Sequence, residues 1–268
     1  MKKILVILVL SLTFPMLALG QLQIRTHGDK ISDFTSKITK VVLTGNDSLD
    51  VPIREAMKDF WTITAYEICS REDFDALKKD EKYYFLAVDK GRDGIRNWRL
   101  VKGGSDKSLA SMVTVAELPI CPADGYTGRE YYLLPALVCH MQHLAAKAVG
   151  SKYKGAGKAV STPKEAAALP IYICSDEITP DAELIQKDLM AAKRMFLVSE
   201  SDADGTFMDG LAAAVCFVVK PLNPRKGQLF FVYLVDTVTN ELYYFKKHKV
   251  SSDAGLLKED IKAFAKGR

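Results

Sequence analysis

The chain has 268 residues, and its contents of 48% hydrophobic and 26% charged residues are those of an ordinary folded protein. Its formal net charge is only +4. That balance gives no reason to expect nucleic acid or an anionic membrane surface as a partner.

Residues 1–20 predict a signal peptide. Lys2 and Lys3 precede an apolar run that ends in Ala18-Leu19-Gly20, which suits cleavage before Gln21. The alternative is a retained membrane anchor, but the run has about the minimum length of a spanning helix and is interrupted by polar residues and a proline. Gln21, and not a cysteine, stands directly after the cleavage position, so no lipid anchor is indicated. We therefore expect a periplasmic or secreted protein without a stable membrane span after cleavage.

After this segment the chain alternates between strands and helices. An apolar strand over 41–43 is followed by a turn and by a helix, because apolar residues recur at helical spacing from Leu49 to Trp61. A strand over 65–69 leads into Ser70-Arg71-Glu72-Asp73, which resembles a capping box. Further elements are expected as strands at 83–88, 98–101 and 112–120 and as a helix over 136–150.

Residues 151–165 contain Gly, Ser, Pro and four lysines, which predicts a flexible loop or linker. This segment divides the chain into a first α/β unit over 21–150 and a second unit over 166–268. One continuous domain over 21–268 is the alternative.

The second unit begins with the same order of elements as the first. A strand over 171–174 precedes Thr179 and Pro180, which open a helix, and a strand over 195–198 follows. We interpret the two units as a repeated architecture. Two such crossovers imply right-handed βαβ units and a partly parallel sheet.

The end of the chain changes character. Three apolar strands separated by turns, "AAAVCFVVKPL", "QLFFVYLVDTVTN" and "ELYYFKKHKV", predict an antiparallel meander, and a helix over 255–268 closes the chain. We therefore expect an α/β fold with a mixed sheet, built from two βαβ units plus a C-terminal antiparallel meander and a terminal helix.

The stretch "VYLVDTVTNELYYF" resembles part of the amino-terminal module of TolB and its relatives, the curli-secretion protein CsgG and the penicillin-binding-protein activator LpoB. Those modules have a strand ending in Val-Asp, a Thr-containing turn and a return strand, similar to Leu234-Val235-Asp236-Thr237 here. The likeness covers roughly 38–90 and 212–265, and Asn240 replaces the usual glycine of the turn. The resemblance implies an envelope protein-interaction module without catalysis.

The segment 199–210, "SESDADGTFMDG", is similar to a calcium loop. With Gly205 at the sixth loop position, acids fall at the first, third and fifth positions, but Leu211 stands where the closing glutamate belongs. The alternative is a polar turn between a strand and a helix, with Gly205 at positive φ and Thr206 or Asp204 as the cap. The candidate metal ligands are Glu200, Asp202, Asp204 and Asp209.

A second group of candidate ligands is Cys139-His140-Met141-Gln142-His143. His140 and His143 are three apart on a predicted helix and would share a face, giving two nitrogen ligands. The zinc-peptidase pattern needs a spacing of four and an adjacent glutamate, which are missing here. The alternative is an ordinary helix with the imidazoles at the edge of its apolar face.

Five cysteines, an odd number, exclude a fully paired monomer. Cys69, Cys174 and Cys216 lie in apolar runs, where a thiol behaves as a small hydrophobe. We expect mostly free, buried thiols, and one disulfide stays open as an alternative.

No phosphate-binding, dinucleotide-binding or serine-hydrolase motif occurs in the sequence. We therefore expect an exported, non-enzymatic envelope protein that binds another protein or an envelope polymer, with calcium as the one candidate cofactor. One alternative is a metal-dependent periplasmic hydrolase that uses the acidic segment 199–210 together with His140 and His143. Another is a small-ligand binding protein that uses the cleft between the two βαβ units.

Overall fold

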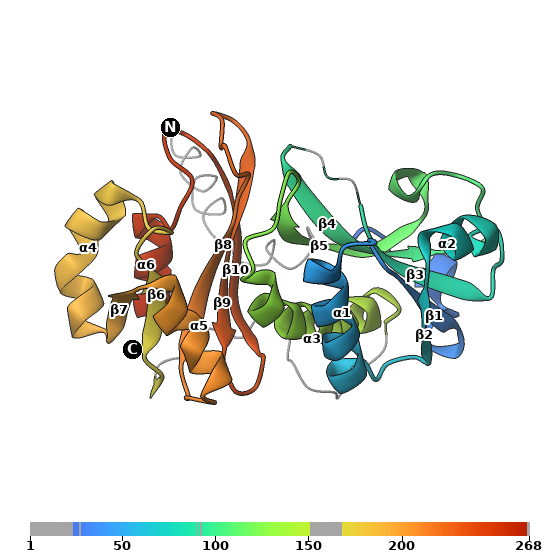
Figure 1. Ribbon diagram of the computed structural model, residues 1–268, viewed down its shortest axis with the longest axis horizontal. Coiled ribbons are helices and arrows are strands. Elements are labelled where there is room, and N and C mark those ends of the chain that lie inside the picture. Colours follow the sequence, from blue (N-terminus) through green and yellow to red (C-terminus); the bar gives the residue numbers. More distant parts are fainter. Residues whose placement is uncertain (1–23, 27, 90, 92, 151–167, 267–268) are drawn as a thin grey trace, which may run out of the picture.

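The computed structural model describes residues 24–26, 28–89, 91, 93–150 and 168–266 (Figure 1). The predicted signal peptide, 1–20, and the predicted linker, 151–165, lie outside the described residues.

The first half of the chain forms a five-stranded sheet with the strand order β2-β1-β3-β4-β5. Strand β1 is parallel to β2 and β3, and β4 is antiparallel to both β3 and β5. Its elements are β1 (Ile38–Val42), α1 (Asp47–Phe60), β2 (Tyr66–Cys69), α2 (Arg71–Leu77), β3 (Tyr83–Val88), β4 (Ile95–Lys102), β5 (Thr114–Pro122) and α3 (Glu130–Ala148).

The second half forms another five-stranded sheet, with the order β10-β9-β8-β6-β7. Strand β6 is parallel to β7 and β8, and β9 is antiparallel to β8 and β10. Its elements are β6 (Ile171–Cys174), α4 (Pro180–Ala192), β7 (Met195–Val198), α5 (Glu200–Met208), β8 (Ala214–Val219), β9 (Leu229–Asp236), β10 (Leu242–Lys249) and α6 (Lys258–Ala265).

The two halves therefore have the same topology. In each, eight elements follow in the order β-α-β-α-β-β-β-α, and the first strand lies between the second and the third. The predicted α/β class, the two βαβ units, the meander and the terminal helix are confirmed. The repeat extends further than expected, because the first half has a meander of its own and the strands form two sheets.

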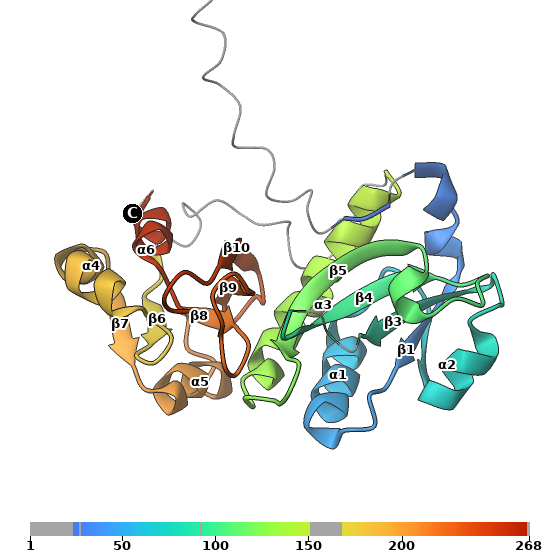
Figure 2. The same cartoon turned by 90° about the horizontal axis from the view of Figure 1, so that it is seen from above.

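Helices cover both faces of each sheet. The first strand has its two parallel neighbours on opposite sides, so successive right-handed crossovers place α1 and α2 on opposite faces, and likewise α4 and α5. Helix α3 packs beside α1, and α6 beside α4, as Figures 1 and 2 show.

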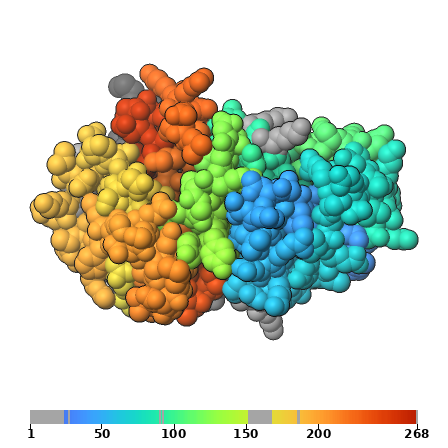
Figure 3. All heavy atoms as spheres, viewed as in Figure 1, coloured from blue at the N-terminus to red at the C-terminus, as the bar shows by residue number. Residues whose placement is uncertain are grey.

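One large hydrophobic cluster spans both repeats, and each repeat has a smaller cluster of its own. The α5-side face of the second sheet contributes Val215, Phe217 and Tyr233 to the same buried cluster as Leu118 and Leu133 of the first repeat. Figure 2 shows β8, β9 and β10 facing α3 and β5, and the spheres of Figure 3 form one continuous surface. Tyr233 also donates a hydrogen bond of 2.8 Å to the backbone oxygen of Pro119. The first repeat thus covers the part of this sheet face that α5 does not cover.

The five cysteines are free and buried, as the apolar runs around three of them predict. Helix α3 begins six positions before its expected start at 136 and ends at Ala148. No helix in the described part of the chain combines the length and the apolar character that a membrane crossing requires.

Candidate functional site

The predicted calcium loop is a helix. Residues Glu200–Met208 form α5, and the Ser199 hydroxyl caps it by accepting from the backbone N–H of Asp202 at 3.1 Å. Gly205 lies inside this helix and not at positive φ, and neither Thr206 nor Asp204 is the N-cap. Both the loop and the turn expected for this segment are therefore wrong. The local cause is the sequence Ser-x-x-Asp, which favours a capped helix start.

The four acidic side chains in α5 and at its C-cap do not converge. Asp202 contacts the cap Ser199 at 2.7 Å, whereas Asp204 forms an ion pair of 3.2 Å with Arg129 of the first repeat. Asp209, the C-cap residue, is seven positions after Asp202, which corresponds to about 10 Å along the helix. This arrangement gives calcium no oxygen cage, and calcium binding by Glu200, Asp202, Asp204 and Asp209 stays a prediction.

The two histidines of α3 lie far from these acids. Asp204 is paired with Arg129 at the N-cap of α3, and His140 follows eleven positions later, about 16 Å along the helix. Burial lowers the pKa of His140 to about 3 and also lowers that of His143. His140 is thus a neutral core residue and does not lie at the edge of the apolar face. The histidines and the acids of α5 form no common site.

In the described part of the chain one group could hold a metal by distance alone: His248, Glu259 and Asp260. Its polar atoms already have partners that join β10 to α6. Asp260 accepts hydrogen bonds from the Tyr244 hydroxyl at 2.6 Å and from the Leu257 backbone at 3.0 Å, and it lies 2.9 Å from His248 Nε2. The Lys246 ammonium lies 2.9 Å from Glu259. A positive charge beside Glu259 disfavours a cation there, so the group is better explained as structural.

A cavity of about 420 Å³ lies between the two repeats, and we refer to it as the inter-repeat cavity. This volume is within the range of small-molecule sites, which often occur where two domains meet. Strands β4 and β5 form one wall, and β9 and β10 form the other. The residues that line the cavity are Arg25, Asp89, Asp93, Ile95, Asn97, Arg99, Glu117, Pro119, Leu229, Phe231, Phe245, Lys246 and Lys247.

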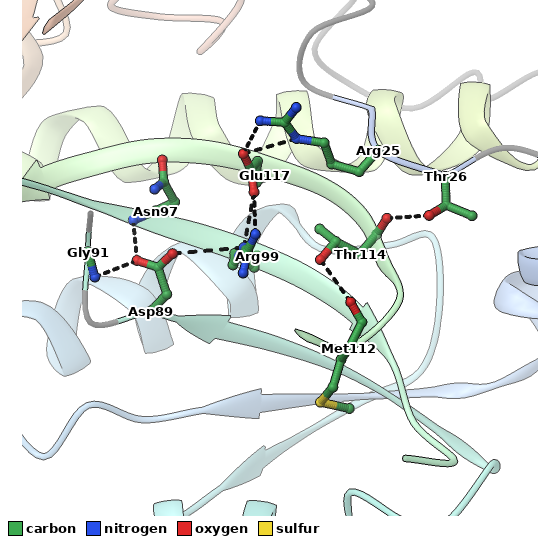
Figure 4. Close-up of polar contacts among 9 residues, drawn as sticks. All are labelled: Arg25, Thr26, Asp89, Gly91, Asn97, Arg99, Met112, Thr114 and Glu117. Carbon is green, nitrogen blue, oxygen red and sulfur yellow. Dashed lines mark hydrogen bonds and ion pairs between the residues drawn. The ribbon is translucent and has the colours of Figure 1, made fainter. Parts of the chain in front are cut away.

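A row of alternating charges crosses the first wall (Figure 4). Glu117 accepts from Arg99 at 2.8 and 3.0 Å through one oxygen, and it accepts from Arg25 through the other. Arg99 Nε in turn lies 3.8 Å from Asp89. The second oxygen of Asp89 accepts the backbone N–H groups of Gly91 and Asn97, each at 2.9 Å. The carboxylates are therefore largely satisfied by the protein itself.

The pKa of Glu117 reflects these contacts. Burial alone would raise this pKa, but the hydrogen bonds and charges of Arg25 and Arg99 outweigh burial and hold it below its ordinary value. Glu117 is thus ionised at neutral pH and fixes the two guanidinium groups. Each of them uses Nε and Nη2 on Glu117, which leaves Nη1 outside these bonds.

The segment before the first repeat completes the rim. Ile24 forms an antiparallel bridge with Ala116 on the edge of β5, and Arg25 donates its backbone N–H to Val115 at 2.8 Å. The Thr26 hydroxyl donates to the Thr114 backbone oxygen at 2.7 Å. These contacts fasten the segment to β5 and place the Arg25 side chain, 48% exposed, over Glu117 (Figure 4).

The opposite wall is mainly apolar. Phe231 and Phe245 are stacked with 6.0 Å between their ring centres, and both are buried. Lys247 is exposed beside them. In total the lining has four basic and three acidic side chains, and the acidic ones include the satisfied Asp89 and Glu117. Besides the exposed carboxylate of Asp93, the groups left to meet a ligand are hydrogen-bond donors that face an apolar wall.

The sequence analysis considers a ligand cleft between the two units but names none of its residues, because they come from five separate parts of the chain and form no local motif. The one available signal is that Arg99 and Glu117 both lie in strands that the sequence predicts. In comparisons with family models, curated proteins and solved structures, nothing matches this chain. The resemblance to the TolB, CsgG and LpoB module therefore stays a prediction.

Proposed function

We propose that this protein is an exported, non-enzymatic binding protein and that it holds its ligand in the inter-repeat cavity. The observation that carries the proposal is a pair of guanidinium groups, those of Arg25 and Arg99, which Glu117 holds in place. They face the apolar wall formed by Phe231 and Phe245. The ligand is an anionic group joined to an apolar body. It is either a free amphiphile or part of another protein or polymer of the envelope.

The side chains that line the cavity favour a ligand with an anionic group. A guanidinium group presents several N–H donors in a plane and binds carboxylate or phosphate oxygens well. The Nη1 groups of both arginines lie outside the bonds to Glu117, and Lys247 adds a further positive charge. Of the three acids that line the cavity, Asp89 and Glu117 already accept hydrogen bonds from the protein, and Asp93 is exposed. Binding is therefore a better explanation than catalysis.

The experiment is a calorimetric titration of the full chain, purified from the cell envelope, with decanoate below its micelle concentration. Decanol and decyltrimethylammonium have the same apolar tail with a neutral and a cationic head. We expect decanoate to bind at least about tenfold more tightly than either, because each charge-assisted hydrogen bond contributes on the order of one tenfold step in affinity.

Arg25→Gln removes one guanidinium at the exposed rim, and we expect it to weaken decanoate binding by about tenfold. Arg225→Gln is the matched control, because Arg225 is exposed in the β8–β9 turn and does not line the cavity. Equal affinity for decanoate and decanol would contradict the anion site, and so would an Arg25→Gln variant that binds as tightly as the Arg225→Gln control.

A further inference from the structure

Exposed apolar side chains gather where the start of α3 meets the end of α5. Tyr131 is 47% exposed, and Met208 and Leu211 are 70% and 53% exposed. Two partly buried rings connect them, because Tyr132 lies 5.2 Å from Tyr131 and is stacked on Phe207 at 5.4 Å, measured between ring centres. We refer to these five residues as the aromatic patch.

The fold does not need the outer members of this patch. Tyr132 and Phe207 pack against the large core cluster, whereas Tyr131, Met208 and Leu211 belong to no hydrophobic cluster of the described residues. Single exposed apolar residues are normal, but a contiguous set across two elements is typical of an interaction surface. In Figure 3 the orange α5, the green α3 and the blue α1 lie side by side on the face toward the viewer, so one partner can contact all three helices.

Acidic side chains border the patch. The Tyr131 hydroxyl is hydrogen-bonded to Glu55 of α1, and the charge of Asp59, one turn further along α1, acts on the same hydroxyl. Asp209 directly follows Met208 at the end of α5. Glu55, Asp59 and Asp209 are all exposed, and we refer to them as the acidic rim.

The two elements that carry the patch have no basic residues to balance this charge. Although the chain has a net charge of +4, neither Lys nor Arg occurs in 130–146 or in 199–219. Arg129, just before α3, is buried in its ion pairs. Arg54 and Lys58 of α1 each precede an acid of the rim by one position, so they point about 100° away around the helix. The surface is therefore apolar with a negative border.

We propose that the aromatic patch docks a basic segment of a partner protein that also presents apolar side chains. The apolar side chains of that segment cover Tyr131, Met208 and Leu211, and its lysine or arginine side chains pair with the acidic rim. A second copy of this chain fits less well, because a two-fold contact brings the same acidic rim against itself. An anionic membrane or a nucleic acid is repelled by the same charges. The proposal uses no residue that lines the inter-repeat cavity.

The test measures the binding of a fluorescent peptide of three Lys-Leu-Leu-Lys units to the full chain by fluorescence anisotropy at low salt. A Glu-Leu-Leu-Glu peptide has the same apolar residues with the opposite charge, and a Lys-Ser-Ser-Lys peptide has the same charge without the apolar residues. We expect the Lys-Leu-Leu-Lys peptide to bind at least about tenfold more tightly than either, because burial of even one leucine contributes about one tenfold step in affinity. Added salt should weaken the binding, since it screens exposed charges.

Two pairs of variants locate the binding surface. Leu211→Ser removes one apolar contact of the patch, and we expect it to weaken binding of the Lys-Leu-Leu-Lys peptide by about tenfold. Leu184→Ser is the matched control, because Leu184 is 79% exposed on α4, outside the patch. Glu55→Lys reverses one charge of the rim and should weaken binding by about fivefold. Glu72→Lys, at an exposed position of α2, should leave binding unchanged.

Three outcomes overturn the proposal. One is equal binding of the three peptides, and another is a Leu211→Ser variant that binds the Lys-Leu-Leu-Lys peptide as tightly as Leu184→Ser does. The third is a native chain that sediments as a dimer together with a monomeric Leu211→Ser variant, because a second copy then covers the patch. None of these outcomes bears on decanoate binding, because Leu211 and Glu55 do not line the inter-repeat cavity.

Discussion

Arg129 Nη1 lies 2.7 Å from Glu177 Oε1, and this ion pair joins the start of α3 in the first repeat to the segment after β6 in the second. Both side chains are almost completely buried, at 5% and 12% exposure. Asp204 of α5 is a second carboxylate partner, and its Oδ1 lies 3.2 Å from Arg129 Nε. Three elements from two repeats thus depend on one guanidinium group.

Replacing this guanidinium should destabilise the whole chain. Arg129→Met leaves Glu177 and Asp204 buried without their cation, and the loss of one partner of a buried pair costs about 3–5 kcal/mol. We expect that decrease in the free energy of unfolding, measured by urea denaturation at pH 7. The exposed Arg225→Met is the control and should change stability by less than about 0.5 kcal/mol. Adding Glu177→Met to Arg129→Met should recover part of the loss, and a further loss in the double variant would count against this account.

A glycine at the repeat interface allows a second test. Gly94 has φ of +82°, and a β-carbon there would lie 2.9 Å from two ring atoms of Pro221 in the second repeat. Gly128 has φ of +89° with nothing within 4 Å of its added β-carbon. Alanine at either position therefore has similar backbone strain, but only Gly94→Ala also overpacks the interface, at about 1–3 kcal/mol. We expect Gly94→Ala to lower the thermal midpoint clearly more than Gly128→Ala. Equal midpoints would show that Pro221 and its neighbours shift to accommodate the added methyl group at no cost in stability.

The two repeats begin their second helices with the same cap. Ser70 accepts from the Asp73 backbone at 3.0 Å, and Ser199 accepts from the Asp202 backbone at 3.1 Å. Loss of an N-cap side chain typically costs about 1 kcal/mol. We expect Ser70→Ala and Ser199→Ala to lose similar amounts of stability in thermal or urea unfolding. Ser252→Ala, at an exposed position outside any helix, is the control.

The same helix start decides how to test the calcium prediction. If Asp202 only supports the cap by its 2.7 Å contact with Ser199, Asp202→Ala should destabilise the metal-stripped and the calcium-loaded protein equally. A ligand that binds only the native state must raise the midpoint with its concentration. A rise with calcium that is absent in Asp202→Ala would instead establish the site that the sequence predicts.

The sequence predicts most of the fold because its strands are short apolar runs between clear turns. The strands over 83–88, 171–174 and 195–198 are found at the expected residues. Helix α5 was missed because alternating acids suggest a calcium loop, although Ser199 and Asp202 repeat the spacing of Ser70 and Asp73. The sequence suggests a cleft between the units, but the residues that line the inter-repeat cavity could not be predicted, because they come from both repeats and the packing of one sheet face against α3 has no local pattern.

The pH dependence of stability should reveal His140, which is fully enclosed in α3. Burial lowers its pKa to about 3, so between that value and the ordinary 6.5 the unfolded chain binds a proton that the folded chain does not. The stability from neutral His140 is therefore complete above pH 6.5 and is lost as pH falls, by about 1.4 kcal/mol per pH unit. Glu177 and Asp204 act in the opposite direction as pH falls toward the ordinary carboxyl range, because burial raises their pKa values and the folded state protonates first.

A variant separates the two effects. His140→Leu removes the contribution of His140 to the pH dependence of stability, whereas Glu177 and Asp204 remain. The difference between wild type and variant in the slope of unfolding free energy against pH therefore isolates the effect of the His140 imidazole. We expect urea unfolding at pH 7.5, 6.5, 5.5 and 4.5 to show a steeper loss of stability in the wild type below pH 6.5. His143→Leu should flatten the slope as well but less, since His143 is only partly enclosed and burial lowers its pKa without the added repulsion of a second imidazole and Lys147. Parallel curves for wild type and His140→Leu would mean that the buried ring gains its proton in the folded chain as easily as in the unfolded one.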